Sequence, residues 1–256
     1  MAILQVNYLS KALFRTVPLN VILPADKLDK KRNTYSMREG ETFKTLYLLH
    51  GLLGNYTDWV NGTRIQRYAE EKNLAVVMPS GDNAFYVNNP VVRNDYSAFI
   101  GSELVSVTRS MFPLSAKRED TFIAGLSMGG YGAIRNGIVY SETFSHVAGL
   151  SSAVHLFEED AELIGGEETL FGDLKEAAKT NVNPTVAFDE LLEQKRPVPK
   201  FYLSCGTNDR LMAANKRFRD VLIKKGADVT WDEEEGGHDW DFWDSQIKKV
   251  LDWLPL

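Results

Sequence analysis

A serine held between glycines stands near the middle of the chain, in the stretch GLSMGG at residues 125–130. The apolar run TFIAG at 121–125 precedes it, and a helix-compatible segment begins at residue 128. A strand, a sharp turn and a helix around G-x-S-x-G are typical of a nucleophile elbow, which lifts the serine hydroxyl above the edge of a sheet. The pattern predicts that Ser127 is a catalytic nucleophile. The alternative is a glycine turn that carries an incidental serine.

A serine hydroxyl needs a general base, and the base needs a group that orients it. On this architecture the chain order is serine, acid, histidine, so the base must come late and follow a strand. Of the four histidines, His50 precedes the serine, His146 opens an apolar run, and His155 comes before the candidate acids. His238, in EEEGGHDWDFW, lies between a predicted strand and the last predicted helix. We therefore expect His238 to be the base.

The histidine follows the last predicted strand, and the orienting acid should follow the strand before it, on the loop at the carboxyl end of that strand. Asp209 occupies this position in FYLSCGTNDRL, directly after the predicted strand 201–205. Asp228 and Asp232 lie in or beside the next strand, and Asp189 falls in a helical surface pattern. The order predicts Asp209 as the acid; a solvated loop carboxylate is the alternative.

A tetrahedral intermediate needs two backbone N–H donors. The residue after the nucleophile, Met128, supplies one of them. The stretch LLHGLLGN at 48–55 follows an early apolar run, and its Gly51 allows close approach of substrate, so Leu52 N–H is the expected second donor. A simple turn with a capping His50 is the alternative for this stretch.

These residues require a parallel sheet, because their loops must meet at one edge. Short, almost continuously apolar runs are typical of parallel strands that are covered on both faces. They occur at 45–50, 74–79, 121–125, 146–152, 201–205 and 228–233. Helical patterns lie between or beside them at 63–72, 97–112, 128–140, 211–225 and 239–253. The alternation predicts an α/β fold with a mostly parallel central sheet and helices on both faces.

Three segments lie outside this alternation. Residues 1–24 predict two antiparallel strands, and the polar stretch 25–44 predicts a surface hairpin or loop. Residues 153–200 are longer than one crossover helix needs and predict a helical insertion on top of the sheet. The insertion is interpreted either as a lid or pocket wall, or as an elaborated crossover. With no linker or repeat, 1–256 is expected to form a single domain.

Composition excludes several classes of function. The chain of 256 residues carries 29 Lys and Arg against 35 Asp and Glu, a net charge of −6, which disfavours nucleic acid and anionic membrane surfaces. No window is apolar enough to span a membrane. We expect no metal and no cofactor, since no spaced His or Cys ligand set occurs. Cys205, the one cysteine, ends a predicted strand and is expected to be a small core residue.

The first residues do not resemble a signal peptide, and a single cysteine cannot form an internal disulfide. A cytoplasmic location is therefore expected, although a mature chain from which a signal had been removed would look the same.

The motifs HGLLGN, GLSMGGYGA, CGTNDRL and GGHDWDFW, with MPSGDNAFYVN at 78–88, resemble the Putative esterase family of the α/β-hydrolase fold along essentially the whole chain. That family holds short-acyl, acetyl and cinnamoyl esterases, S-formylglutathione hydrolases and, more distantly, mycolyltransferases. The resemblance implies Ser127, Asp209 and His238 as a triad, with Leu52 and Met128 as oxyanion donors. It also implies that Gly51, Tyr86 and Trp240 lie near the substrate, although both aromatic residues could equally belong to the core.

Members of the S-formylglutathione hydrolase branch usually carry a cysteine shortly after the oxyanion glycine, and HGLLGNYTDW has none. The sequence therefore predicts a serine carboxylesterase that acts on small-molecule esters with short acyl groups. Feruloyl or acetyl-xylan esterase activity is the first alternative, followed by acyl transfer and by a non-catalytic binding module. The oligomeric state stays open, with a homo-oligomer as one outcome.

Overall fold

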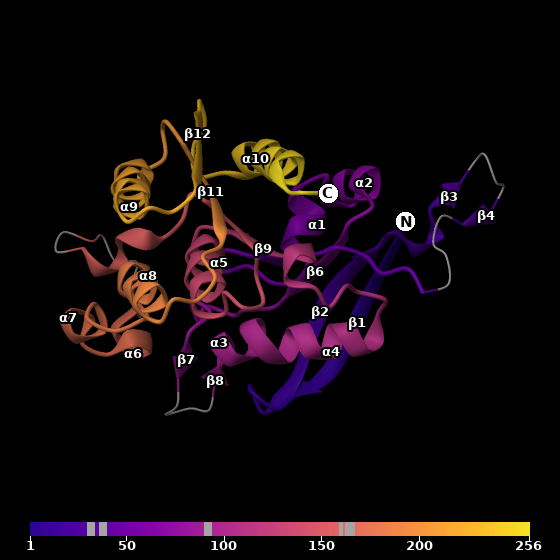
Figure 1. Ribbon diagram of the computed structural model, residues 1–256, viewed down its shortest axis with the longest axis horizontal. Coiled ribbons are helices and arrows are strands. Elements are labelled where there is room, and N and C mark those ends of the chain that lie inside the picture. Colours follow the sequence, from indigo (N-terminus) through magenta and orange to yellow (C-terminus); the bar gives the residue numbers. More distant parts are fainter. Residues whose placement is uncertain (30–33, 36–39, 90–93, 159–160, 162–166) are drawn as a thin grey trace.

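A computed structural model describes residues 1–256 except 30–33, 36–39, 90–93, 159–160 and 162–166 (Figure 1). Its centre is an eight-stranded sheet with the order β1-β2-β6-β5-β9-β10-β11-β12. The first two strands are antiparallel to their neighbours, and the six from β6 to β12 are parallel to one another. The strands are β1 Ala2–Ser10, β2 Arg15–Leu23, β5 Thr45–Leu49, β6 Ala75–Pro79, β9 Thr121–Leu126, β10 His146–Leu150, β11 Lys200–Gly206 and β12 Val229–Glu234. The predicted mostly parallel sheet with antiparallel N-terminal strands is confirmed.

Helices cover both faces of this sheet (Figure 1). One face packs against α1 Asp58–Gly62, α2 Ile65–Lys72 and α10 Trp240–Trp253. The other packs against α4 Leu104–Met111, α5 Met128–Val139, α8 Pro184–Glu193 and α9 Met212–Lys224. Within β9, Phe122 and Leu126 contribute to the first core and Ile123 to the second, which is the two-residue alternation of a strand buried on both sides.

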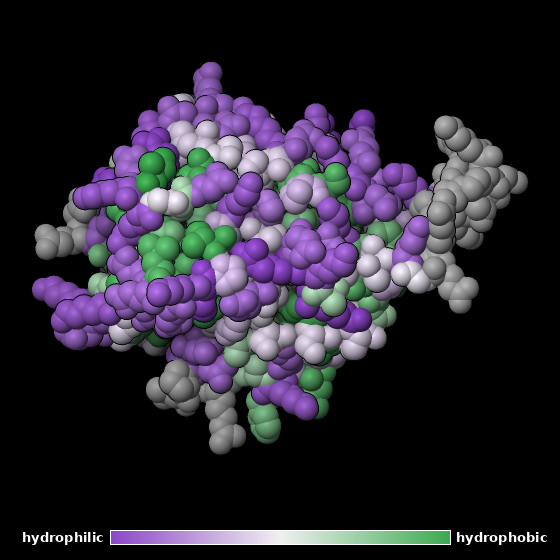
Figure 2. Space-filling view, viewed as in Figure 1, coloured by the Kyte–Doolittle hydropathy of each residue, from purple (hydrophilic) through white to green (hydrophobic). Residues whose placement is uncertain are grey.

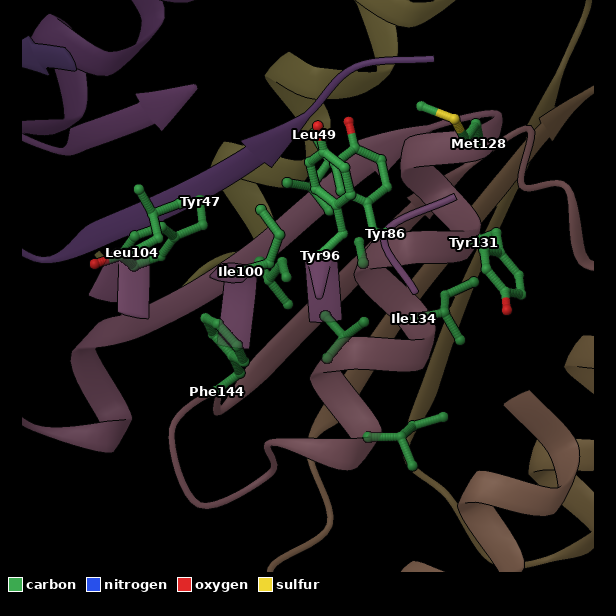
Figure 3. Close-up of a cluster of buried hydrophobic side chains, with 14 of the residues drawn as sticks. Tyr47, Leu49, Tyr86, Tyr96, Ile100, Leu104, Met128, Tyr131, Ile134 and Phe144 are labelled. Carbon is green, nitrogen blue, oxygen red and sulfur yellow. The ribbon is translucent and has the colours of Figure 1, made fainter. Parts of the chain in front are cut away.

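The core under α5 is rich in aromatic side chains. Figure 3 shows Tyr47, Tyr86, Tyr96 and Tyr131 together with aliphatic side chains from the sheet and the helices. The Met128 side chain also belongs to this core and is fully buried. The buried Met128 side chain therefore anchors the first turn of α5, directly after the predicted nucleophile Ser127.

The predicted segment 97–112 divides into three pieces: α3 Tyr96–Ala98, a π-helical turn Phe99–Glu103 and α4. Glu103 in the π-helical turn accepts hydrogen bonds from the backbone N–H groups of Lys11 and Ala12. The local widening of the helix thus accompanies a tie to the turn between β1 and β2.

Outside the main sheet, β3 Leu28–Asp29 pairs antiparallel with β4 Thr34–Tyr35, as expected of a hairpin in 25–44. A second small pair joins β7 Asn88–Asn89 and β8 Asn94–Asp95. The β3–β4 hairpin extends away from the body at the right of Figure 1.

The segment 153–200 contains a 3-10 turn Val154–Phe157 and the helices α6 Glu167–Phe171, α7 Leu174–Ala177 and α8. Phe188 and Leu191 of α8 are fully buried in the core beside α5, so α8 acts as the crossover helix between β10 and β11. The shorter helices lie at the periphery on the same side (Figure 1). Figure 2 shows that polar side chains cover most of this view, with the largest hydrophobic area between α8 and α9.

Candidate active site

Ser127 occupies a strained turn between β9 and α5. Its backbone has φ 52° and ψ −118°, a conformation that a residue with a side chain adopts at a cost of about 1–3 kcal/mol. Two backbone hydrogen bonds fix the turn. Ser127 N–H donates to Leu150 O at 2.9 Å, and Ser127 O accepts from Ala153 N–H at 3.0 Å. The side chain therefore leaves the turn in a defined direction.

The glycines beside the serine allow the turn to pack closely. A Cβ atom at Gly125 would lie 2.2 Å from Gly129 O, and one at Gly129 would lie 2.4 Å from Leu49 O. Both obstacles are backbone atoms, which cannot move as a side chain can. A larger residue at either glycine would therefore clash with the backbone of the neighbouring helix or of the chain after β5.

His238 lies on the loop between β12 and α10, and Asp209 lies on the loop after β11. His238 Nε2 is 3.0 Å from Ser127 Oγ, and His238 Nδ1 is 2.8 Å from Asp209 Oδ2. Trp243 packs edge-on against the imidazole, with ring centroids 5.0 Å apart. The fold therefore brings together the three residues that the sequence predicted, although they are up to 111 positions apart.

Asp209 is buried, and the structure compensates its charge. Burial alone would raise the pKa of this carboxyl, but hydrogen bonds from His238 and from Leu211 N–H at 2.8 Å hold the pKa below its usual value. An ionised Asp209 accepts from Nδ1–H, which leaves Nε2 of His238 free to accept the Ser127 proton.

A cavity of about 470 Å³ opens at Ser127. Its lining residues are Gly51, Leu52, Asp58, Leu126, Ser127, Arg210, His238, Asp239, Trp240 and Trp243. Within the described part of the chain, neither Leu52 N–H nor Met128 N–H donates a hydrogen bond. Two free donors beside a serine hydroxyl suit the developing charge of an oxyanion.

His50 supports the loop that carries Leu52, a role that the sequence did not predict. His50 Nε2 accepts from Gly81 N–H at 2.7 Å, so Nδ1 carries the proton and donates to Gly51 O at 2.7 Å. Burial lowers the pKa of His50, which favours the neutral ring that this pair of bonds requires. The histidine before a glycine in HGLLGN was the available signal, but the sequence suggested a capping role for His50 only as the alternative to an oxyanion loop.

Tyr86 lies behind this loop rather than at the mouth of the cavity. It is fully buried, and its hydroxyl donates to His50 O at 3.0 Å. Of the two alternatives for Tyr86, near the substrate or in the core, the structure places the ring in the core below the oxyanion loop. Periodicity could not show this, since residues 82, 85 and 86 all have left-handed backbone.

Trp240 does line the cavity, as expected, and so does Trp243, which was not predicted. Trp240 packs edge-on against Trp59 at 5.6 Å and against Trp243 at 5.2 Å between ring centroids. These rings form one rigid wall that ends at His238. Gly51, also expected near the substrate, lines the same cavity.

The other candidates take structural places. Cys205 is buried, and burial together with nearby Asp209 raises the pKa of its thiol to about 12, so it is not a nucleophile at neutral pH. His146 packs against Phe122 and Trp253 at the amino end of β10. The structure shows no cluster of three or more potential metal ligands among the residues it describes. None of the described helices is both long and apolar enough to cross a membrane.

The chain is similar in sequence to known esterases. The model of the family described as "Putative esterase" matches residues 10–254. An acetyl esterase of Caldicellulosiruptor saccharolyticus is 40% identical over 263 residues, which cover 99% of this chain and 98% of that protein.

Solved structures agree with this. FphF of Staphylococcus aureus, a fluorophosphonate-binding serine hydrolase with bound substrate, matches with a TM-score of 0.86 at 32% identity over 99% of this chain and 98% of that one. An S-formylglutathione hydrolase (FrmB) from Staphylococcus aureus matches with a TM-score of 0.85, also at 32% identity and the same coverage. A ferulic acid esterase shares the fold, with a TM-score of 0.79 at 20% identity over 99% of this chain and 97% of that one.

Proposed function

The chain belongs to the Putative esterase family and is a carboxylic ester hydrolase, and from this premise we propose that it cleaves short-acyl esters through a Ser127–His238–Asp209 triad and an acyl-enzyme. The observation that supports this most directly is the chain of two hydrogen bonds, 3.0 Å from Ser127 Oγ to His238 Nε2 and 2.8 Å from His238 Nδ1 to Asp209 Oδ2. A nucleophile, a base and an orienting acid in this order are what a weak hydroxyl nucleophile needs.

In the first half of the reaction, Ser127 Oγ attacks the ester carbonyl carbon while His238 Nε2 takes the hydroxyl proton. The charged imidazole that results is stabilised by Asp209, whose lowered pKa keeps it ionised. The carbonyl oxygen becomes an oxyanion, which accepts from the N–H groups of Leu52 and Met128. The C–O bond to the alcohol then breaks, and the alcohol leaves with the proton from His238.

In the second half, a water molecule replaces the alcohol. His238 takes a proton from the water as the oxygen attacks the acyl carbon, and the same two N–H groups hold the second oxyanion. Ser127 leaves with the proton, and the carboxylic acid is released. The cavity wall of Trp240 and Trp243 limits the volume beside the serine, and the similarity to an acetyl esterase supports a short acyl group.

The test is the substitution Ser127→Ala. Its expected effect is a fall in kcat for p-nitrophenyl acetate of about 10⁴-fold or more, because the nucleophile and the acyl-enzyme are lost together. A fluorophosphonate probe should label the wild-type protein and not the variant.

The matched control is Ser110→Ala on α4, an exposed serine whose hydroxyl bonds to Val107 O within its own helix. It should keep wild-type turnover and wild-type labelling. Turnover by Ser127→Ala within tenfold of the wild type, at an unchanged melting temperature, would exclude Ser127 as the nucleophile.

S-formylglutathione thioester hydrolysis is the second candidate, supported by the 32% identical FrmB structure. The absence of a cysteine in HGLLGNYTDW argued against it from the sequence, but the similarity keeps the activity under consideration. Rates with p-nitrophenyl acetate, methyl ferulate and S-formylglutathione, measured on one preparation, would rank the ester and thioester alternatives.

A further inference from the structure

Arg210 stands at the boundary between the cavity at Ser127 and a second, smaller cavity. It follows the triad aspartate directly in the chain, and its side chain is exposed. It lines the 470 Å³ cavity and also a neighbouring one of about 290 Å³, whose lining includes His155, Glu158, Leu211, Ala214 and Arg217. One guanidinium therefore faces both the site of the reaction and the space next to it.

The charge of Arg210 has no partner among the described residues. No ion pair or hydrogen bond joins its side chain to another residue of the described ranges, in contrast to most arginines of this chain. The carboxylate in the described lining of the second cavity, Glu158, is already engaged, because Arg217 Nε and Nη2 donate to its two oxygens at 3.0 and 2.5 Å. The described lining of the second cavity thus carries two guanidinium groups and one carboxylate, an excess of one positive charge.

The order of the strands determines whether the acyl part or the alcohol part of the ester lies beside Arg210. β5 with Leu52 lies on one side of β9, while β10, β11 and β12 lie on the other. Arg210 follows β11 and His238 follows β12, so the arginine and the base are on the same side of Ser127. The leaving alcohol must receive its proton from His238 Nε2 and therefore lies on the Arg210 side, away from the oxyanion donors.

We propose that Arg210 is a specificity residue that favours esters whose leaving alcohol carries a carboxylate. The anionic end of the alcohol would lie in the second cavity and accept hydrogen bonds from the guanidinium, whose planar geometry matches a carboxylate. This proposal rests on the proposed serine esterase function, since it assigns the orientation of the substrate from the role of His238.

Two carboxylates of the first cavity do not cancel this preference. Asp58 Oδ1 accepts from Asn55 N–H at 3.1 Å, and Asp239 Oδ1 accepts from Phe242 N–H at 3.0 Å at the start of α10. Neither lines the second cavity. Their negative charges therefore disfavour an anion in the cavity at Ser127, while Arg210 favours one in the second cavity.

The experiment compares two acetate esters of equal size and shape, 4-acetoxybenzoate and 4-acetoxybenzamide, which differ in one negative charge on the alcohol. The quantity measured is the ratio of their kcat/KM values in the wild-type protein and in Arg210→Gln. We expect the ratio of anionic to neutral ester to fall about five- to tenfold in the variant, as for the loss of one partly exposed charge-assisted hydrogen bond. The change should occur mainly in KM, because the carboxylate is bound equally in the ground state and the transition state.

Three controls accompany it. Arg67→Gln removes the same charge from α2, where Arg67 pairs with Glu71 on the exposed surface, and should leave the ratio unchanged. Arg210→Lys keeps the charge and should recover part of the ratio. In the wild type, the ratio should fall as the salt concentration rises, since ions screen an exposed pair.

Other outcomes would overturn the proposal. An equal ratio in the wild type and Arg210→Gln would show that the arginine does not recognise the anion. A higher kcat/KM for monoethyl succinate than for diethyl succinate that is lost in Arg210→Gln would show that Arg210 recognises a carboxylate on the acyl part of the ester instead. The proposed esterase function fails separately, through turnover of the neutral ester that survives Ser127→Ala.

Discussion

The two ends of the parallel strands differ in their backbone. Of the nine non-glycine residues with left-handed φ in the described part of the chain, six follow the carboxyl ends of β5, β6, β9 and β10: Leu53, Asp82, Phe85, Tyr86, Ser127 and Ser151. The left-handed residues nearest the amino ends are Asn73, which caps α2, and Lys195, which follows α8. An asparagine at a helix end is an ordinary use of this conformation, whereas a phenylalanine or a serine in a loop is costly.

This difference shows where the fold stores strain. Each left-handed residue costs about 1–3 kcal/mol and persists only where the surroundings determine it. At the carboxyl ends the surroundings are hydrogen bonds between loops, such as Tyr86 Oη to His50 O and Ser127 N to Leu150 O. At the amino ends the strands begin in extended backbone, and stability there comes from packing. Mutations at the carboxyl ends of the strands should therefore mainly reduce catalysis, and mutations at the amino ends should mainly reduce stability.

Among changes that leave the three triad side chains intact, the largest effect is expected for Gly129→Ala at the carboxyl end. The added Cβ would lie 2.4 Å from Leu49 O and 2.5 Å from His50 O, so α5 and the oxyanion loop must separate. We expect kcat/KM for p-nitrophenyl acetate to fall at least about 100-fold, since about 1 Å of displacement in a catalytic constellation has that cost.

Gly137→Ala, two turns further along α5, is the matched control. Its Cβ would meet Val147 side-chain atoms at 2.3 Å, at a distance from the turn. It should lower the melting temperature while the folded protein keeps its activity. Equal loss of activity in both variants would remove the distinction between the two ends of the sheet.

An intermediate effect is expected for His50→Ala. The variant loses the bonds to Gly81 N–H and Gly51 O, which fix the loop that presents Leu52 N–H. We expect kcat to fall about 10- to 100-fold with little change in KM, as for loss of an interaction made in the transition state. Steady-state kinetics at saturating substrate measure this.

Tyr86→Phe provides a graded comparison, because it removes one hydrogen bond to the same loop and keeps the packing. Its kcat should fall less than that of His50→Ala. A rise in KM at unchanged kcat in both variants would mean that the loop binds substrate rather than stabilising the oxyanion.

The sequence was sufficient to predict the sheet and the chain order of the catalytic residues, for a physical reason. Strands buried on both faces must be continuously apolar, and a tight strand–turn–helix needs glycine where a Cβ meets backbone, as at Gly125 and Gly129. Both requirements are local, so they leave a visible pattern. Asp209 and His238 then followed from the order of strands in the fold.

The loop after β6 could not be predicted in the same way. Asp82, Phe85 and Tyr86 adopt left-handed backbone without glycine, since the His50 hydrogen bonds to distant residues compensate the cost. Trp243 of α10 and Arg210 after β11 both line the cavity at Ser127, although they are far from the serine in sequence. In the segment 153–200, the sequence predicted a helical insertion, but not the position of α8 beside α5, which depends on packing between residues far apart in the chain.

The smallest effect is expected at the amino end, in the pH dependence of stability at His146. Burial, with the nearby Lys200 and Arg118, lowers the pKa of His146 to about 4. In the unfolded chain this histidine has its ordinary pKa near 6.5, so between pH 6.5 and 4 unfolding takes up a proton. The free energy of unfolding therefore decreases as the pH is lowered through this range. Because the ring is partly exposed, we expect a loss of about 1 kcal/mol over this range, absent in His146→Phe and measured by urea unfolding. At pH 8 both proteins should hydrolyse p-nitrophenyl acetate equally, because the imidazole packs edge-on against Phe122 and Trp253 at the end of the sheet opposite Ser127. Unequal rates would mean that the two ends are coupled through β9 and β10.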